Sequence, residues 1–242
     1  MTAVLGSEET SPWTMNTPLP KLRYEKKFIA EGFSLGEVLT WVHRNPAAFR
    51  EAYPNRVINN IYLDSPGLTD YHDHIQGAAH RSKTRVRWYG TSAEGLERPV
   101  LERKIKRGHA GTKFSYPLPC LTQNGAPLRH HLQEAFQAPS LPENLRSLLK
   151  LVAPSLFNRY RRHYFVSGDR KLRLTVDYGI QFGKPHAMNG KLSRSILLPT
   201  VVVELKFEPE HTDKAAVAAN ALPLRLTRCS KYVLGIEHVD KH

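Results

Sequence analysis

Residues 81–90 have the sequence RSKTRVRWYG, in which a cation occupies every second position from Arg81 to Arg87. Successive side chains of a β-strand point to opposite faces, so this spacing predicts a strand with one basic face and an opposite face that carries Val86 and Trp88. The basic face comprises Arg81, Lys83, Arg85 and Arg87. Because four cations in a row repel one another, the stretch indicates a β-strand that lines an anion-binding surface.

Five further segments alternate between charged and apolar residues in the same way: 22–30, 98–107, 159–166, 171–178 and 200–207. Their predicted charged faces carry Arg23, Glu25 and Lys27; Glu102, Lys104 and Lys106; Arg159 and Arg161; Lys171, Arg173, Thr175 and Asp177; and Val202, Glu204 and Lys206. If the apolar faces pack outward against helices, the charged faces line an interior. A dry interior could not hold so many unpaired cations, whereas a water-filled tunnel that takes up a polyanion could.

The segments between these strands predict helices and further strands. A helix begins at Ser34, which is spaced to form a capping box with Glu37. The other predicted elements are strands over 57–64, 113–118, 180–183 and 192–198, a turn at Asn189-Gly190, and helices over 68–76, within 128–152 in two pieces, over 212–221 and after Ser230. The expected fold class is α+β, an eight-stranded antiparallel β-barrel closed into a tunnel and flanked by helices. Residues 1–20 are expected to form a disordered leader, and residues 21–242 one domain.

The charge of the chain indicates an anionic partner. The sequence has 35 Lys+Arg against 22 Asp+Glu, a formal net charge of +13, which alone favours nucleic acid. RNA-binding sheets usually present aromatic rings on the basic face, whereas Trp88 and Tyr160 are predicted on the opposite face. The pattern thus favours phosphate chains over specific nucleic-acid recognition, with a flat basic sheet for nucleic acid as the open alternative.

The compartment is predicted from what the sequence lacks. It has two cysteines without a disulfide framework, no apolar stretch long enough to span a bilayer and no signal-peptide pattern. We therefore expect a cytoplasmic protein, with attachment to the inner face of a membrane through a partner protein as an alternative.

Acidic residues among the cations suggest a metal site. Glu25, Glu102, Asp177 and Glu204 are predicted on the charged faces. They could serve only as counter-ions for the cations. For Glu102 this interpretation has the same weight as a role in binding metal. Alternatively, one or two could hold Mg²⁺ or Mn²⁺, which prefer carboxylate oxygen. Glu204 is the strongest candidate because its strand is otherwise so apolar.

An ordered set of motifs carries a family resemblance: RYEKKF, IYLDSPGLTDY, RSKTRVRWYG, VLERKIK, LRLTVDY, VVVELKF and SKY. From about residue 21 to 239 the chain resembles the VTC domain, the polyphosphate polymerase domain of the vacuolar transporter chaperone complex, within the triphosphate tunnel metalloenzyme (CYTH) superfamily. The resemblance implies an eight-stranded tunnel that binds ATP or another nucleoside triphosphate, polyphosphate or pyrophosphate, and Mn²⁺ or Mg²⁺.

The resemblance also implies roles for single residues. Expected phosphate ligands are Lys27, Arg85, Arg87, Lys104, Arg159, Arg173 and Lys231. Arg81, Lys83, Arg161 and Lys206 are expected to add binding contacts, and Glu204 with Glu25 to bind the metal.

One departure from the family pattern bears on the reaction. Hydrolytic members of the superfamily typically carry ExExK on the first strand, whereas here Arg23 replaces the first glutamate. The change removes an acid and makes the entrance more basic, which favours polyphosphate synthesis. A metal-dependent tripolyphosphatase or nucleoside triphosphatase, and a non-catalytic polyanion-binding module, are the alternatives.

Overall fold

The computed structural model describes residues 23–91, 95–108, 110–122, 127–185 and 195–239. The leader predicted over 1–20 and the turn predicted at Asn189-Gly190 lie outside these residues. The order of the elements is β1 (Tyr24–Glu31), α1 (Leu35–His43), β2 (Arg50–Asp64), α2 (Thr69–Ile75), β3 (His80–Tyr89), β4 (Gly95–Leu96), β5 (Val100–Arg107), β6 (Ala110–Pro117), β7 (Leu121–Thr122), α3 (Leu128–Ala135), α4 (Glu143–Leu149), β8 (Ala153–Val166), β9 (Arg173–Gly183), β10 (Ile196–Leu198), β11 (Thr200–Phe207), a short 3₁₀ turn (Pro209–His211), α5 (Thr212–Asn220) and α6 (Lys231–Val239).

The predicted succession of helices and strands matches this order closely. The capping box at the start of α1 is present: the Ser34 amide donates to Glu37 Oε2 at 2.8 Å, and the Glu37 amide donates to Ser34 Oγ at 3.3 Å. The segment predicted as a separate strand over 180–183 instead continues β9. Within the described ranges, no helix is long and apolar enough to cross a membrane.

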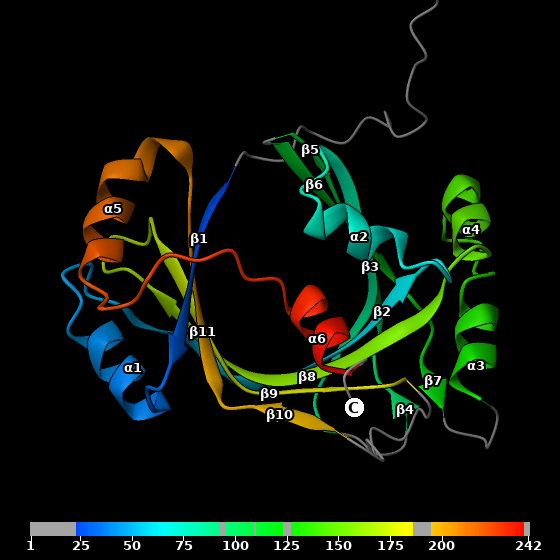
Figure 1. Cartoon of the computed structure of the whole chain (residues 1–242), viewed down its shortest axis with the longest axis horizontal. Helices are drawn as coiled ribbons and strands as arrows, with labels where there is room; N and C mark the ends of the chain where they lie inside the picture. Colours follow the sequence, from blue (N-terminus) through cyan, green and yellow to red (C-terminus); the bar gives the residue numbers. More distant parts are fainter. Residues whose placement is uncertain (1–22, 92–94, 109, 123–126, 186–194, 240–242) are drawn as a thin grey trace, which may run out of the picture.

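Nine strands form one antiparallel, strongly curved sheet in the order β1-β11-β9-β8-β2-β3-β5-β6, with β10 paired to β9 as its ninth strand. β4 and β7 pair with each other in a separate two-stranded sheet. Figure 1 shows the sheet curled around α6, with α1 and α5 outside one wall and α3 and α4 outside the other. We call the side that faces α6 the concave face and the opposite side the convex face.

The predicted closure into a barrel is not confirmed. Among the described residues β1 and β6 remain two separate edges of the sheet and form no ladder with each other. Across this seam, Lys104 Nζ of β5 lies 3.8 Å from Glu25 Oε2 of β1. The edge of β1 is instead covered by the segment before α6: Phe28 forms an isolated bridge with Leu226, and the Thr227 amide donates to the Lys27 carbonyl at 2.9 Å.

Two separate apolar clusters cover the convex face. One joins α1 and α5 to β1, β9 and β11 through residues such as Val38, Val203 and Ala218. The other joins α3 and α4 to β2, β3 and β5 through residues such as Leu132 and Val86. Each wall of the sheet is therefore held by its own core.

A third apolar cluster fills one end of the concave face. Tyr232 and Ile236 of α6 pack there with Ile180 and Phe182 of β9. A Cβ atom added at Gly235 would overlap the side chains of Leu156 and Phe182, so this glycine permits the close seating of α6. We call this the filled end, and the opposite end, where β9 begins and β11 finishes, the open end.

Candidate functional site

The strand registers gather the predicted charged rows on the concave face. Lys83 lies opposite Lys104, and Arg85 opposite Glu102. On the other wall, Lys27 lies opposite Glu204. The concave face also receives Arg81, Arg87, Lys106, Arg173, Lys206 and Glu25 from the same rows, and Lys231 from the start of α6.

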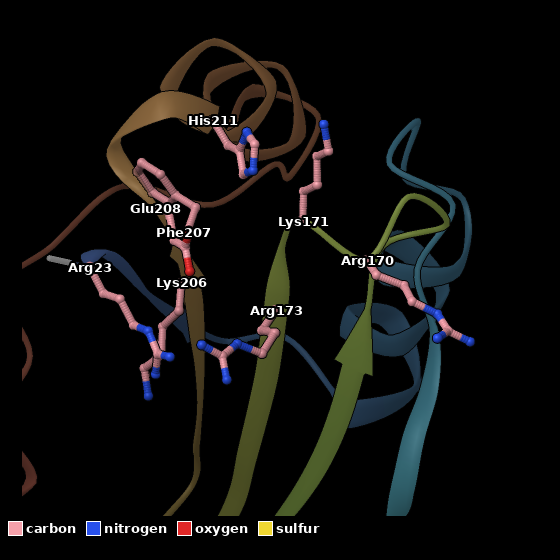
Figure 2. Close-up of a pocket in the computed structure, with 8 residues that line it drawn as sticks. All are labelled: Arg23, Arg170, Lys171, Arg173, Lys206, Phe207, Glu208 and His211. Atoms are coloured by element: carbon pink, nitrogen blue, oxygen red, sulfur yellow. The ribbon is translucent and has the colours of Figure 1, made fainter. Parts of the chain in front are cut away.

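The open end is basic. Figure 2 shows Arg23, which directly precedes β1, pointing toward Lys206 of β11 and Arg173 of β9. Lys206 and Arg173 are direct neighbours across two paired strands. Both residues were predicted to bind the ligand, and the structure brings them together at the entrance rather than at the centre.

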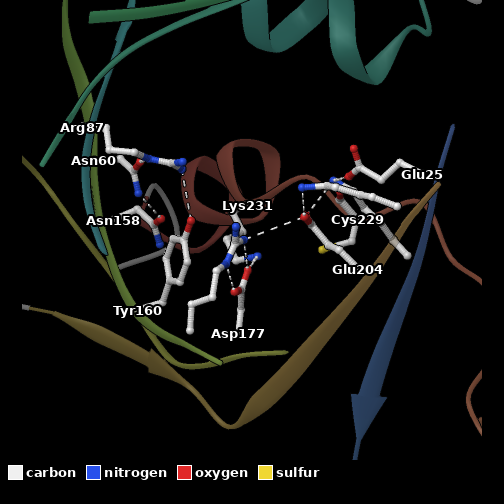
Figure 3. A network of polar contacts seen from close by, with 12 residues as sticks. Glu25, Asn60, Arg87, Asn158, Tyr160, Asp177, Glu204, Cys229 and Lys231 are labelled. Atoms are coloured by element: carbon white, nitrogen blue, oxygen red, sulfur yellow. Dashed lines mark hydrogen bonds and ion pairs between the residues drawn. The ribbon is translucent and has the colours of Figure 1, made fainter. Parts of the chain in front are cut away.

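Glu204 is the centre of a buried charge network (Figure 3). Its Oε1 lies 3.1 Å from Lys27 Nζ and its Oε2 lies 3.0 Å from Lys206 Nζ. Burial acts to raise the pKa of Glu204, but the ammonium groups of Lys27 and Lys206 outweigh it and hold the pKa well below its usual value. The carboxylate is therefore ionised at neutral pH and already paired with cations.

Asp177 forms a second, fully buried part of this network. Arg162 donates two hydrogen bonds to its carboxylate, one from Nε to Oδ1 and one from Nη2 to Oδ2 at 2.7 Å. Lys231 Nζ lies 2.6 Å from the same Oδ2. Burial acts to raise the pKa of Asp177, and Arg162 and Lys231 together lower it below its usual value. Asp177 thus holds two cations beside the start of α6.

Glu102 plays the same role on the opposite wall. Its Oε2 accepts a hydrogen bond of 2.6 Å from Arg85 Nη2, and its Oε1 lies 2.7 Å from Lys113 Nζ. Despite burial, Arg85 and Arg87 bring the pKa of Glu102 down to about 2. The counter-ion interpretation of Glu102 therefore agrees with the structure.

Besides its ion pair with Glu102 at 3.7 Å, Arg87 is oriented by hydrogen bonds to uncharged groups. Its Nε donates to Asn60 Oδ1 at 2.8 Å, and its Nη2 donates to the Tyr160 hydroxyl at 3.1 Å. Asn60 in turn donates to Asn158 Oδ1 at 3.1 Å. This chain of buried side chains fixes the guanidinium group, which preorganises it for an anion.

Lys83 is a cation of the concave face that lacks a carboxylate partner among the described residues. Its Nζ instead donates to Ser230 Oγ at 2.7 Å. Burial, followed by the nearby charges of Lys27 and Lys104, lowers the pKa of Lys83 to about 7. A bound anion would remove this penalty and favour the charged form.

Cations thus outnumber carboxylates across the concave face. The carboxylates are Glu25, Glu102, Asp177 and Glu204, and the cations are Lys27, Arg81, Lys83, Arg85, Arg87, Lys104, Lys106, Lys113, Arg162, Arg173, Lys206 and Lys231. A row of phosphates would supply the missing negative charge, with Arg as a bidentate donor and Lys as a point charge.

Two predicted ligands lie on the wrong face. Arg159 and Arg161 of β8 were expected on the charged face, but Arg159 Nε donates to Asn59 Oδ1 at 2.7 Å and its guanidinium covers the ring of Phe157, on the convex side. Arg161 is exposed to solvent. Tyr160 and Arg162 point inward instead. Tyr160 therefore does share the basic face, but it is only 2% exposed and cannot stack on a nucleobase.

The sequence contained a signal for this correct register. Phe157 and Phe165 occupy odd-numbered positions of β8, as do Arg159 and Arg161. Both phenylalanines are buried in the apolar clusters of the convex face. Because the side-chain period of a strand is two, these apolar anchors assign the odd positions of β8 to the convex face. Arg162, Tyr160 and Asn158 were thus missed although the pattern could have found them.

Three oxygen atoms surround the ammonium group of Lys27 and form the candidate site for a metal ion. Lys27 Nζ lies 2.8 Å from Glu25 Oε1 and 3.1 Å from Glu204 Oε1, and it donates to the Cys229 carbonyl at 3.2 Å. In the described residues, no set of three Asp, Glu, His or Cys side chains forms a metal-binding group. Any divalent ion here would rely on these two carboxylates and on ligand oxygens.

Two solved structures resemble the fold at low sequence identity. One is a candidate adenylate cyclase from Vibrio parahaemolyticus, with 11% identity, a TM-score of 0.49, and coverage of 88% of this chain and 98% of the other. The second is the PH1819 protein from Pyrococcus horikoshii OT3, with 12% identity, a TM-score of 0.48, and coverage of 89% and 99%.

Sequence comparison identifies the family. No curated protein sequence matches the chain. The family model of the VTC domain matches residues 22–239, a range that includes every described strand and helix. This chain therefore belongs to the VTC domain family.

Proposed function

We propose that this chain is a triphosphate-handling enzyme, and specifically a metal-dependent polyphosphate polymerase that transfers the γ-phosphate of ATP to the end of a phosphate chain. The observation that carries the proposal is the excess of buried, preorganised cations on one continuous concave face. Membership of the VTC domain family supports it.

The cations at the centre of the concave face would bind the triphosphate. Arg85 and Arg87 approach from one wall, and Lys231 from the start of α6. The side chain of Ser230 caps the first turn of α6 by accepting from the Val233 amide at 3.3 Å, so the positive end of the helix also faces this region. Together these groups favour an oligophosphate over a singly charged anion.

The residues around Lys27 fit a divalent cation. Mg²⁺ and Mn²⁺ prefer oxygen ligands, and Mg²⁺ is commonly held by one or two carboxylates with phosphate oxygens completing its coordination. Glu204 and Glu25 would hold the ion in this chain. Such an ion neutralises charge on phosphate oxygens during transfer.

The transfer would form one P–O bond and break one. A terminal oxygen of the phosphate chain forms a bond to the γ-phosphorus, the bond from this phosphorus to the β–γ bridging oxygen breaks, and ADP leaves with the electron pair. Arg87 and Lys231 would stabilise the negative charge on the oxygens of the γ-phosphoryl group. The protein thus contributes binding, alignment and electrostatics, and no covalent intermediate is needed.

Arg23 supports synthesis over hydrolysis. It lies at the open end and points toward Lys206 and Arg173 (Figure 2). An arginine here attracts a second polyanion, the acceptor chain, whereas an acid would repel it.

The test is incubation of the protein with ATP and Mn²⁺, followed by separation of products on a gel and assay of free phosphate. We expect chains longer than triphosphate from the wild type and from Arg161→Gln, a charge-removing control on the convex face. We expect none from Glu204→Gln. Release of orthophosphate without chain growth would assign the site to a tripolyphosphatase or nucleoside triphosphatase, and tight triphosphate binding without turnover would indicate a non-catalytic binding module.

A further inference from the structure

Three tyrosines surround one arginine on the concave face. The guanidinium carbon of Arg56 lies 5.6 Å from the ring centre of Tyr53 and 5.9 Å from the ring centres of both Tyr89 and Tyr164. The rings of Tyr53 and Tyr164 also meet edge to face, with 5.9 Å between their centres. We call these four residues the tyrosine cluster, to which the proposed function gives no role.

The strand registers turn the tyrosine cluster toward the anion-binding residues. Tyr89 follows Arg87 by two positions on β3, so both side chains point to the concave face. Tyr164 follows Arg162 by two positions on β8 in the same way, and Arg56 of β2 lies directly opposite Arg162. The cluster therefore lies on the wall formed by β2, β3 and β8, beside the central charge network.

The tyrosine cluster lies toward the open end and is accessible there. Val166, the last residue of β8, pairs with Arg173, the first residue of β9, and Tyr164 is only two positions away. Tyr53 is 60% exposed and Tyr89 is 44% exposed. Large aromatic side chains that are exposed together beside a charged site are typical of a ligand-binding surface.

The chemistry of the cluster suits a planar aromatic ligand that carries phosphate. Tyrosine rings and the guanidinium plane of arginine both stack on nucleobases. Among the described residues no carboxylate forms an ion pair with Arg56. Glu51, the nearest acid along the chain, lies instead against His163, with 3.6 Å between Oε1 and Nδ1. The positive charge of Arg56 is therefore available to a phosphate-bearing ligand.

The distance of the cluster from the centre matches the length of a nucleotide. Arg87 donates to Asn60, and Arg56 precedes Asn60 by four positions on β2, which is about 13 Å along a strand. If the γ-phosphate lies at Arg87, the other two phosphates and the ribose bridge such a distance before the base begins. Tyr232 and Ile236 fill the opposite end, so the nucleoside must extend toward the open end, where the tyrosine cluster lies.

We propose that the tyrosine cluster is the nucleobase-binding subsite of this chain, in which the base of a nucleoside triphosphate stacks against Tyr53, Tyr89 and Arg56. The inference rests on the proposed function, because the triphosphate must occupy the centre for its base to reach these side chains. Arg23 lies beside β1 and Arg173 on β9, so the nucleoside and an acceptor chain would reach the centre along different strands.

The experiment compares the binding of ATP and of inorganic tripolyphosphate, which lacks the nucleoside. The test variant is Tyr53→Leu/Tyr89→Leu, which removes the two exposed rings, whereas Tyr53→Phe/Tyr89→Phe keeps the rings without their hydroxyl groups. The matched control is Tyr24→Leu/Phe33→Leu, which removes two rings of similar exposure, 46% and 41%, on the convex side. Calorimetry without divalent metal measures affinity in the absence of phosphoryl transfer, and urea denaturation checks that each variant is folded.

We expect Tyr53→Leu/Tyr89→Leu to bind ATP about tenfold more weakly than the wild type, because stacking of a base on an aromatic side chain contributes a factor of about ten. Its affinity for tripolyphosphate should change less than about twofold. The phenylalanine variant and the control variant should match the wild type for both ligands.

An unchanged affinity of the leucine variant for ATP would overturn the subsite and leave the proposed function intact. An equal loss of affinity for ATP and for tripolyphosphate would also overturn it, because the rings would then act on the phosphates or on the fold rather than on the base. A wild type whose ATP binding depends on the two rings, but which forms no phosphate chains from ATP and Mn²⁺, would retain the subsite and refute the polymerase. Displacement of ATP by single-stranded RNA at equal base concentration would overturn the assignment to a mononucleotide.

Discussion

Replacing Arg162 by glutamine tests the inward face of β8 and the structure of the charge network. Arg162 donates two hydrogen bonds to the fully buried Asp177, and Arg161 beside it is exposed on the convex face. Removing one partner of a buried ion pair generally costs about 3–5 kcal/mol, because the other charge stays buried. Lys231 still pairs with Asp177 at 2.6 Å, so we expect about 3 kcal/mol, at the lower limit of that range.

The free energy of unfolding is measured by urea denaturation at several pH values. Arg162 helps to hold the pKa of Asp177 below its unfolded-state value, so its stabilisation is present above that value and lost as pH falls through the folded-state pKa. The difference between wild type and Arg162→Gln should therefore be largest at neutral pH and shrink below about pH 4.

Arg161→Gln is the matched control and should change stability by less than about 0.5 kcal/mol. The reasoning is refuted if Arg161→Gln is as destabilising as Arg162→Gln. It is also refuted if the cost of Arg162→Gln does not depend on pH.

Three other substitutions test separate parts of the structure. Gly235→Ala should destabilise the fold by about 1–3 kcal/mol in urea denaturation, because the new methyl group overlaps Leu156 and Phe182. The control is Gly36→Ala in α1, where an added Cβ meets only Ser34 Oγ at 3.9 Å, and it should be neutral or stabilising. Lys83 has a pKa of about 7, and binding an anion raises it. The affinity for tripolyphosphate, measured by calorimetry, should therefore fall about fivefold more between pH 7 and pH 8 in the wild type than in Lys83→Arg. Equal pH profiles of the two proteins would contradict this role of Lys83. Glu204→Gln should bind metal-free tripolyphosphate about fivefold more tightly than the wild type, because Lys27 and Lys206 lose their buried partner. The variant should also lose any enhancement of tripolyphosphate binding by Mn²⁺. Calorimetry with and without Mn²⁺ checks both expectations, and an unchanged Mn²⁺ effect would show that Glu204 does not bind the metal.

The two faces of most strands could be predicted because residues at alternate positions along the strand differ clearly in polarity. In β3, cations alternate with Val86 and Trp88, and in β11, Glu204 and Lys206 alternate with Val203 and Leu205. β8 was the exception, because its odd and even positions both contain arginine and aromatic residues, and two basic residues on the convex side misled the assignment. The anchors Phe157 and Phe165 carried the missing information.

Closure of the sheet could not be derived from alternation. A side-chain pattern identifies which face of a strand is buried, but pairing of the first and last strands is a long-range contact that depends on the curvature of the whole sheet. Likewise, the sequence left Glu102 equally open to a counter-ion role and a metal-ligand role. The pairing of Asp177 with Arg162 and Lys231 depends on registers between β8 and β9 and on the seating of α6.

The unpaired seam between β1 and β6 has a thermodynamic consequence. The two walls that meet there belong to different apolar clusters and are joined across the seam by side chains rather than by a backbone ladder. An anion that contacts both walls would add cross-links in the folded state that the unfolded chain cannot make. Occupancy and folding are then linked equilibria, and the melting temperature would rise with the logarithm of ligand concentration above the dissociation constant. In this architecture an anion bound to both walls would in effect be a structural component, and the empty protein would be the less stable form.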